Sequence, residues 1–356
     1  MMKKIGIITL FGYENYGNRL QMYATQKIYE ELGFESTVLR INMKKSLKVK
    51  MKYLIKKIVN LKEERLKKKR IENFKQHAKN FIKESEEIID FYQGSKIINK
   101  NYDYFSVGSD QIWSKDVAKY RNRNLIFLRF TTKEKRIVYA PSFGHSEIEE
   151  KYIPMLREMF EGFSCISIRE NEGKKIIEKI INKKIEVLLD PTMSIDRVIW
   201  ENFAKKHKYR PEKKYILTYF LGKPCKKVED ILENYKKEYE IIKLNDIRFG
   251  KYYDVNPSEW VDYINNTSLF LTDSFHGVVF SLIFKKPFSV YERIGGNSMN
   301  SRIKTILNKF NVENRWNLSK ENNILFSKPS NIDKILKKEK DKTFKFLKKS
   351  LGIKDE

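Results

Sequence analysis

The chain has 356 residues, of which 41% are hydrophobic and 13% aromatic, so its composition excludes a wholly disordered protein. This length exceeds what a single hydrophobic core usually serves, and we therefore expect two domains. The formal net charge of +26 leaves two interpretations open, an attraction to polyanions and a plain over-use of lysine.

The sequence also argues against a disulfide framework, a metal site, a membrane span and a signal peptide. The two cysteines, Cys165 and Cys225, have no CxxC partner, so neither a disulfide framework nor a zinc site is expected. The four histidines lack HxxxH-type spacing, and we expect no metal. No apolar stretch approaches the roughly 18–20 residues of a membrane span. The apolar run after the first lysines is shorter than the core of a signal peptide, so we expect a cytoplasmic protein.

Strands and helices alternate along the first half of the chain. Residues 3–10 form an apolar, β-rich run, and residues 18–32 carry apolar side chains at three-to-four spacing, which predicts a helix that Gly33 ends. Further strands are predicted at 36–41, 102–107, 136–139, 165–168 and 185–189. The very basic stretch at 44–92 is predicted to be helical. This order favours a parallel sheet, and polar residues follow several strands, at the edge where open α/β sheets bind ligands.

A second α/β cycle follows residues 191–211, which we interpret as the region between two domains. Its predicted strands lie at 215–221, 240–244, 269–274 and 287–292. Its predicted helices lie at 226–239, 258–266 (capped by Ser258), 276–284 and 299–310, and a basic amphipathic helix is predicted at 332–351.

The predicted fold class is therefore α/β, with two domains that face each other across a cleft. Residues 1–195 form the first domain, which contains the basic helical insertion at 44–92. Residues 196–320 form the second domain, and residues 321–356 form a basic helical tail.

The sharpest functional signal surrounds His276. An apolar strand ends at residues 272–274, and His276-Gly277 then opens an apolar helix, whose first backbone N–H groups make an anion site. Gly277 would let a ligand approach the backbone closely, and His276 could bind a phosphate or move a proton. The alternative is an ordinary capped helix with His276 at the surface. The coincidence of strand, turn, His-Gly and helix favours the functional interpretation.

Two arginines could bind an anion. Arg169 directly follows a strand, where its guanidinium can donate two hydrogen bonds to a carboxylate or phosphate. Its alternative role is a salt bridge to Glu170 or Glu172. Arg302 lies in the first turn of a helix that follows the glycines at 295–296, and a cation there opposes the helix dipole unless it reaches an anion. Its alternative is a solvated side chain.

Two polar turns carry weaker signals. The turn at 11–19 follows the first strand and contains glycine, but it matches neither a dinucleotide-binding nor a P-loop fingerprint. The turn at 108–111, together with Trp113, offers polar groups and an aromatic face suited to sugar stacking. Both are also compatible with plain turn chemistry.

Six ordered blocks make the sequence resemble the polysaccharide pyruvyl transferase family. These blocks are NYGNRLQMYA (15–24), VGSDQIW (107–113), SIRENEG (167–173), LLDPT (188–192), TDSFHGVVFSLIFKKPF (272–288) and SMNSRI (298–303). Together they cover most of residues 3–310, and their order is specific. The insertion at 44–92 and the tail beyond residue 320 lie outside the resemblance.

The resemblance implies a GT-B-like fold, in which two Rossmann-like domains face each other across a cleft, with phosphoenolpyruvate as the donor and no cofactor. It implies that the enolpyruvyl unit moves onto a sugar of a surface polysaccharide, or of its lipid-linked precursor, as a pyruvate ketal. His276 matches the family's catalytic histidine. The residues that would bind the donor are Arg169, Arg302, Ser274 and Gly277. The residues that would bind the glycan acceptor, from the first domain, are Asn15, Tyr16, Asn18, Ser109 and Asp110.

Other functions stay open at this point. A GT-B glycosyltransferase would share the cleft but use a nucleotide sugar, and an inactive family member would act as a scaffold. A nucleic-acid partner is not expected, because Tyr53 is the one aromatic residue in the basic stretch at 44–70 and no recognised nucleic-acid module is present. The basic segments at 44–70 and 332–351 suggest contact with the inner face of an anionic membrane, and a solvated helical face explains them equally well.

Overall fold

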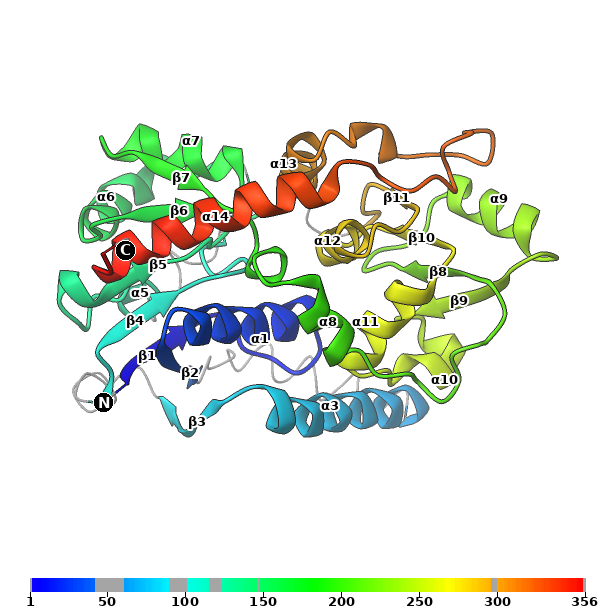
Figure 1. The fold of residues 1–356 in the computed structure, drawn as a ribbon, viewed down its shortest axis with the longest axis horizontal. Coiled ribbons are helices and arrows are strands. Elements are labelled where there is room, and N and C mark those ends of the chain that lie inside the picture. The colour runs from blue at the N-terminus through cyan, green and yellow to red at the C-terminus, as the bar shows by residue number, and fades with distance from the viewer. Residues whose placement is uncertain are drawn as a thin grey trace.

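The structure, a computed structural model, describes residues 2–41, 61–89, 101–114, 123–145, 147–295 and 300–354. Two sheets with helices packed around them make up its two halves, which lie end to end along the long axis of the molecule (Figure 1). The strand pairings among the described elements are parallel, as the alternation of strands and helices predicts.

The N-terminal half is built on one parallel sheet with an adjoining strand pair. The strands of the sheet, in spatial order, are β3 (Glu84–Ile89), β2 (Phe34–Ile41), β1 (Lys3–Ile8), β4 (Tyr104–Val107) and β5 (Arg136–Val138). The adjoining pair is β6 (Ile166–Ile168) and β7 (Ile185–Val187), and β6 contacts β5. The helices of this half are α1 (Tyr16–Glu31), α3 (Leu61–Phe81), α5 (Arg123–Ile126), α6 (Ile153–Glu161) and α7 (Asn171–Ile180).

The C-terminal half has a parallel sheet of its own. Its strands, in spatial order, are β11 (Phe288–Val290), β10 (Leu269–Thr272), β8 (Tyr215–Tyr219) and β9 (Glu240–Leu244). The helices that follow β7 are α8 (Arg197–Phe203), α9 (Lys226–Tyr235), α10 (Gly250–Tyr253), α11 (Pro257–Asn266), α12 (Phe275–Ile283), α13 (Asn300–Lys309) and α14 (Ile332–Leu351). None of the helices in the described ranges combines the length and the apolarity that a membrane crossing requires.

Two local predictions are wrong, and in both cases a specific interaction decides the outcome. The basic stretch was predicted to be helical up to residue 92, but residues 84–89 form strand β3, because the edge of β2 offers unpaired backbone groups that outweigh local propensity. Residues 44–60 and 90–92 of that stretch lie outside the described residues. Helix α11 is capped by Asn256 rather than Ser258, since Asn256 and Glu259 form a capping box.

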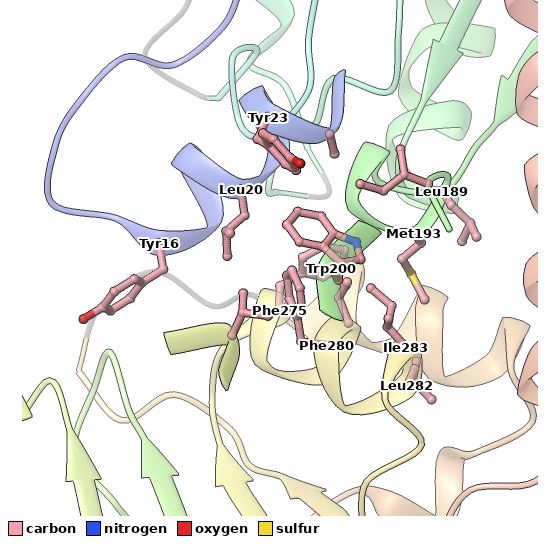
Figure 2. Close-up of a cluster of buried hydrophobic side chains, with 14 of the residues drawn as sticks. Tyr16, Leu20, Tyr23, Leu189, Met193, Trp200, Phe275, Phe280, Leu282 and Ile283 are labelled. Carbon is pink, nitrogen blue, oxygen red and sulfur yellow. The ribbon is translucent and has the colours of Figure 1, made fainter. Parts of the chain in front are cut away.

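Aromatic side chains join the two halves into one core. Tyr16 at the start of α1 stacks on Trp260 of α11, with ring centroids 5.3 Å apart, and its hydroxyl donates to the carbonyl of Val255 at 2.7 Å. Trp200 of α8 lies between Tyr23 of α1 and Phe280 of α12, at centroid distances of 5.5 and 4.8 Å (Figure 2). Helix α1 therefore belongs by sequence to the first half but also packs on the second.

The C-terminal helix α14 returns across the molecule to the N-terminal half (Figure 1). Near its start Asp333 pairs with Lys285 at 2.7 Å, and at its end the carbonyl of Leu351 accepts a hydrogen bond from the hydroxyl of Tyr104. Leu347 is fully buried in the same core cluster as α1 and α12. We expected residues 321–356 to form a basic helical tail; the helix forms as α14, and it packs on both halves.

This packing predicts a loss of stability on truncating Leu347. Leu347→Ala removes buried methyl groups and leaves a cavity, which should lower the free energy of unfolding by about 2–5 kcal/mol. Urea unfolding measures the change, with Lys345→Ala on the exposed face of α14 as the control. If the two variants are equally stable, α14 does not hold the halves together.

Candidate active site

A cavity of about 570 Å³ lies between the two halves, at the carboxyl ends of strands from both sheets. Its N-terminal wall comes from the segment after β1, the first turn of α1 and the segment after β4. Its C-terminal wall comes from the start of α12 and from two arginines. The residues that line it include Leu10, Phe11, Tyr13, Glu14, Asn15, Asn18, Asp110, Gln111, Leu221, Ser274, Phe275, His276, Arg293 and Arg302.

The N-termini of two helices meet at this cavity. Asn15 caps α1 by accepting a hydrogen bond from the backbone of Asn18, and Ser274 caps α12 by accepting one from the backbone of Gly277. Each helix start carries a partial positive charge and presents backbone N–H groups. Two such ends on opposite walls make the cavity suited to an anionic ligand.

His276 lies in the first turn of α12 and is 7% exposed. Its Nε2 atom is 3.6 Å from a carboxylate oxygen of Asp190, and the ring of Phe275 meets it edge-on at 5.2 Å. Its other side faces Gly17 of α1, where a β-carbon would come within 2.0 Å of Nδ1. Gly17 is therefore required for α1 to approach the imidazole, and the two helix starts hold the ring between them.

Arg169 is buried behind the cavity wall rather than on it. Its guanidinium donates to Asp190 and, at 3.2 Å, to Asp110, and it lies 4.5 Å from the centre of the Phe275 ring. The ion pairs considered from the sequence, to Glu170 or Glu172, are not the ones it forms. Arg169 does not line the cavity, and its guanidinium pairs with two carboxylates, so its predicted donor-binding role stays a prediction. Arg169 fixes Asp110 and Asp190, which lie next to the ligand space and next to His276.

Burial and charge oppose each other in the pKa values of this cluster. Burial raises the pKa of both carboxyls, but the charges of Arg169 and His276 outweigh it and hold the pKa of Asp190 and of Asp110 below the ordinary range, with Arg302 adding to the effect on Asp110. Burial, reinforced by Arg169, lowers the pKa of Arg302 to about 9, which still leaves it protonated at pH 7.

Two arginines of the C-terminal half lie on the cavity wall. Arg302, predicted from the sequence, places Nη1 3.4 Å from Asp110, a carboxylate of the other half. Arg293 was not predicted. It follows β11 and lies 3.4 Å from Asp273, which also accepts hydrogen bonds from the backbone of Leu221 and Gly222. Its position just past a strand was the available signal, the same one that pointed to Arg169.

The remaining predicted residues divide between wall and interior. Asn15, Asn18, Asp110 and Ser274 line the cavity. Three others do not line it, and their binding roles stay predictions. The ring of Tyr16 lies in the inter-domain core. The hydroxyl of Ser109 donates a hydrogen bond to the carbonyl of Ala140 at 2.8 Å. At Gly277, a β-carbon would lie 2.8 Å from Oγ1 of Thr272. Gly277 thus allows α12 to pack on β10.

Parts of the predicted pattern lie outside the described residues, namely Gly296 and the first two residues of the block at 298–303. Within the ranges that the structure describes, no group of three or more His, Cys, Asp or Glu side chains is placed to hold a metal ion.

The sequence profile for polysaccharide pyruvyl transferase matches residues 15–293, more than three quarters of the chain. This chain belongs to the polysaccharide pyruvyl transferase family. The match contains both helix starts at the cavity together with Asp110, Arg169, Asp190 and His276, and it ends at Arg293. The protein is therefore a transferase of polysaccharide biosynthesis. Among proteins with curated descriptions, none matches this transferase in sequence.

Several solved structures are similar to this pyruvyl transferase family member at low sequence identity. Anabaena HepE, in complex with UDP and glucose, has a TM-score of 0.50 and 10% identity over 99% of this chain and 100% of its own. UDP-GlcNAc 2-epimerase from Neisseria meningitidis, bound to UDP-GlcNAc, has a TM-score of 0.43 and 11% sequence identity, over 96% of this chain and 100% of its own. The enzyme of the same name from Rickettsia bellii has a TM-score of 0.45 and 8% sequence identity, over 99% of this chain and 100% of its own. The predicted fold class, α/β with two GT-B-like domains, is confirmed.

The contact between Gly17 and His276 gives a test of the site geometry. Gly17→Ala should displace the imidazole or separate the two helix starts, so we expect transferase activity to fall by at least about tenfold, since small misplacements of catalytic groups have large effects. Gly250→Ala is the control, because its β-carbon would make only an ordinary contact, 3.5 Å from Leu66. Equal activities of the two variants would show that the close approach has no functional role.

The depressed pKa of Asp190 predicts a pH-dependent contribution to stability. Ionised Asp190 stabilises the folded state above its unfolded-state pKa of about 3.9, and this contribution is lost as the pH falls below that value. Asp190→Asn should therefore lower the free energy of unfolding by about 3–5 kcal/mol at pH 7, with a smaller difference at pH 3.

Urea unfolding at the two pH values measures this effect. The control is Asp333→Asn, which breaks an exposed ion pair and should change stability by less than about 1 kcal/mol. A difference between Asp190→Asn and the parent protein that grows on acidification would contradict the charge assignment.

Proposed function

We propose that this transferase moves the enolpyruvyl unit of phosphoenolpyruvate onto two hydroxyls of one sugar in a surface polysaccharide or its lipid-linked precursor, and so forms a pyruvate ketal. The single observation that carries the proposal is the meeting of two helix N-termini with His276, Arg293 and Arg302 at one cavity. These groups present positive charge or N–H donors from opposite walls. Phosphoenolpyruvate carries a phosphate and a carboxylate on one carbon, so it needs two such subsites side by side.

The cavity supports a placement of the donor. The start of α12 offers free N–H groups beside His276, which suits the more highly charged phosphate. Arg302 and Arg293 lie on the same wall and suit the carboxylate, to which an arginine can donate two hydrogen bonds. A volume of about 570 Å³ leaves room for a sugar beside so small a donor, and Asn15 and Asn18 on the opposite wall supply polar groups for its hydroxyls.

The reaction balances without a cofactor. The methylene carbon of the donor gains a proton, and one sugar hydroxyl bonds to the adjacent C2 carbon and releases its own proton. The C2–O bond to phosphate then breaks, and a second hydroxyl of the same sugar bonds to C2. Of the two hydroxyl protons, one ends on the new methyl group and the other on inorganic phosphate. His276 protonates or holds the departing phosphate, and Arg302 and Arg293 neutralise the anions.

Removal of the imidazole tests this assignment. His276→Ala should lower turnover about 10²- to 10⁴-fold, the usual range for a general acid. Mass spectrometry of glycan acceptors incubated with phosphoenolpyruvate measures turnover through the added pyruvyl mass. Arg248→Ala removes an exposed arginine outside the cavity and serves as the control, with thermal unfolding to confirm that both variants fold.

Two outcomes would count against the proposal. His276→Ala with near-parental turnover would remove His276 from the chemistry. Saturable thermal stabilisation of the parent protein by UDP-sugars, with none by phosphoenolpyruvate, would favour a nucleotide-sugar glycosyltransferase instead.

A further inference from the structure

A second cavity of about 800 Å³ adjoins the first on the N-terminal half. It is bounded by α3, by the loop after β1, by strand β2 and by the edge strand β3. The residues that line it are Phe11, Tyr13, Arg40, Ile41, Lys75, Lys79, Ile82, Lys83, Glu84, Ser85, Glu86 and Ile88. Phe11 and Tyr13 line both cavities, so the two cavities meet at these two rings. We call this second cavity the α3 groove.

The two shared rings are held in fixed positions. Phe11 and Tyr13 meet edge to face at 5.4 Å, and the guanidinium of Arg19 lies 4.6 and 4.2 Å from their centroids. Arg19 also pairs with Glu84 at 2.5 Å, and the hydroxyl of Tyr13 donates to the other oxygen of Glu84 at 2.7 Å. Both rings stay partly exposed. Rigid, partly exposed aromatic rings suit the apolar face of a sugar, because stacking costs them little conformational entropy.

Positive charge lies beyond the rings. Lys75 and Lys79 are exposed, one helical turn apart on α3, and the Nζ atom of Lys75 is 5.6 Å from the Tyr13 ring. Among the described residues neither lysine forms an ion pair with a carboxylate. The acidic Glu84 is already neutralised by Arg19. Four basic side chains therefore line the groove, Arg40, Lys75, Lys79 and Lys83, against two carboxylates, Glu84 and Glu86. The groove has an aromatic entrance and an excess of positive charge, which attracts an anion.

We propose that the α3 groove binds the part of the glycan acceptor that lies beyond the pyruvylated sugar, and that this part carries a phosphate or carboxylate group. This inference rests on the proposed function, since it assumes that the reacting sugar lies in the first cavity. The chain then crosses Phe11 and Tyr13 and brings its anionic group to Lys75 and Lys79. A uronic acid within the glycan and a phosphate at its reducing end share this chemistry.

Calorimetric binding to three tetrasaccharides tests the proposal: a neutral hexose tetramer, the same tetramer with a reducing-end phosphate, and a tetramer of hexuronic acids. The parent protein should bind at least one anionic probe about tenfold more tightly than the neutral one, as expected for two exposed charge pairs, and this preference should weaken with added salt. The probe that is preferred identifies the source of the charge.

The double variant Lys75→Ala/Lys79→Ala should bind all three probes equally, about tenfold more weakly than the parent binds its preferred probe. Its matched control is Lys334→Ala/Lys338→Ala, which removes two exposed lysines, also four residues apart, from α14 and should keep the preference. Failure of the parent to favour either anionic probe, or an unchanged preference in the first double variant, overturns the proposal. Charge-dependent binding without any pyruvyl transfer would reject the proposed function and retain the groove.

Discussion

The site depends on the aromatic contact between α1 and the C-terminal half. Trp200 lies between Tyr23 and Phe280 (Figure 2). Tyr16 also stacks on Trp260, so α1 of the first half is fixed against α11 and α12 of the second. Each aromatic pair of this kind contributes about 0.5–1.5 kcal/mol beyond its burial. Domains joined by small polar interfaces move relative to one another, whereas this interface is apolar and continuous with the core. The start of α1 is therefore held opposite the start of α12.

A buried ionic cluster of two arginines and two aspartates fixes the charges around the cavity between the two helix starts. Arg169 holds Asp110 and Asp190, while Arg302 reaches Asp110 from the other half of the molecule. Burying so many charges is costly, and apolar residues of similar size would often give equal stability. A functional requirement would explain such a cluster. It places Asp190 beside His276, and it places Asp110 on the cavity wall that would face the donor. Arg169 thus acts on the site through its neighbours.

Most elements of the fold could be predicted from the sequence because their signals are local. The apolar run of β10 and the capped helix after it lie within one short segment, and the structure differs from the prediction there by a few residues. The features that were missed depend on contacts distant in sequence. Strand β3 forms because the edge of β2 is free, and α14 docks on a surface assembled from both halves.

In the candidate site, too, the features that the sequence did not predict depend on contacts between segments distant in sequence. The sequence indicated His276 and Arg302 as residues near an anion, but it could not show that two carboxylates from other strands would occupy Arg169. It could not distinguish Asn15, on the wall, from its neighbour Tyr16, in the core, because both follow the same turn. The α3 groove was not foreseen at all, since its walls come from segments that meet only in the folded protein.

The most direct test of this account is a crystal structure of the protein with phosphoenolpyruvate bound. The phosphate should accept hydrogen bonds from the backbone at the start of α12 and lie within reach of His276, with the carboxylate at Arg302 or Arg293. Donor density elsewhere, for example at the ends of β8 and β9 away from His276, would contradict it.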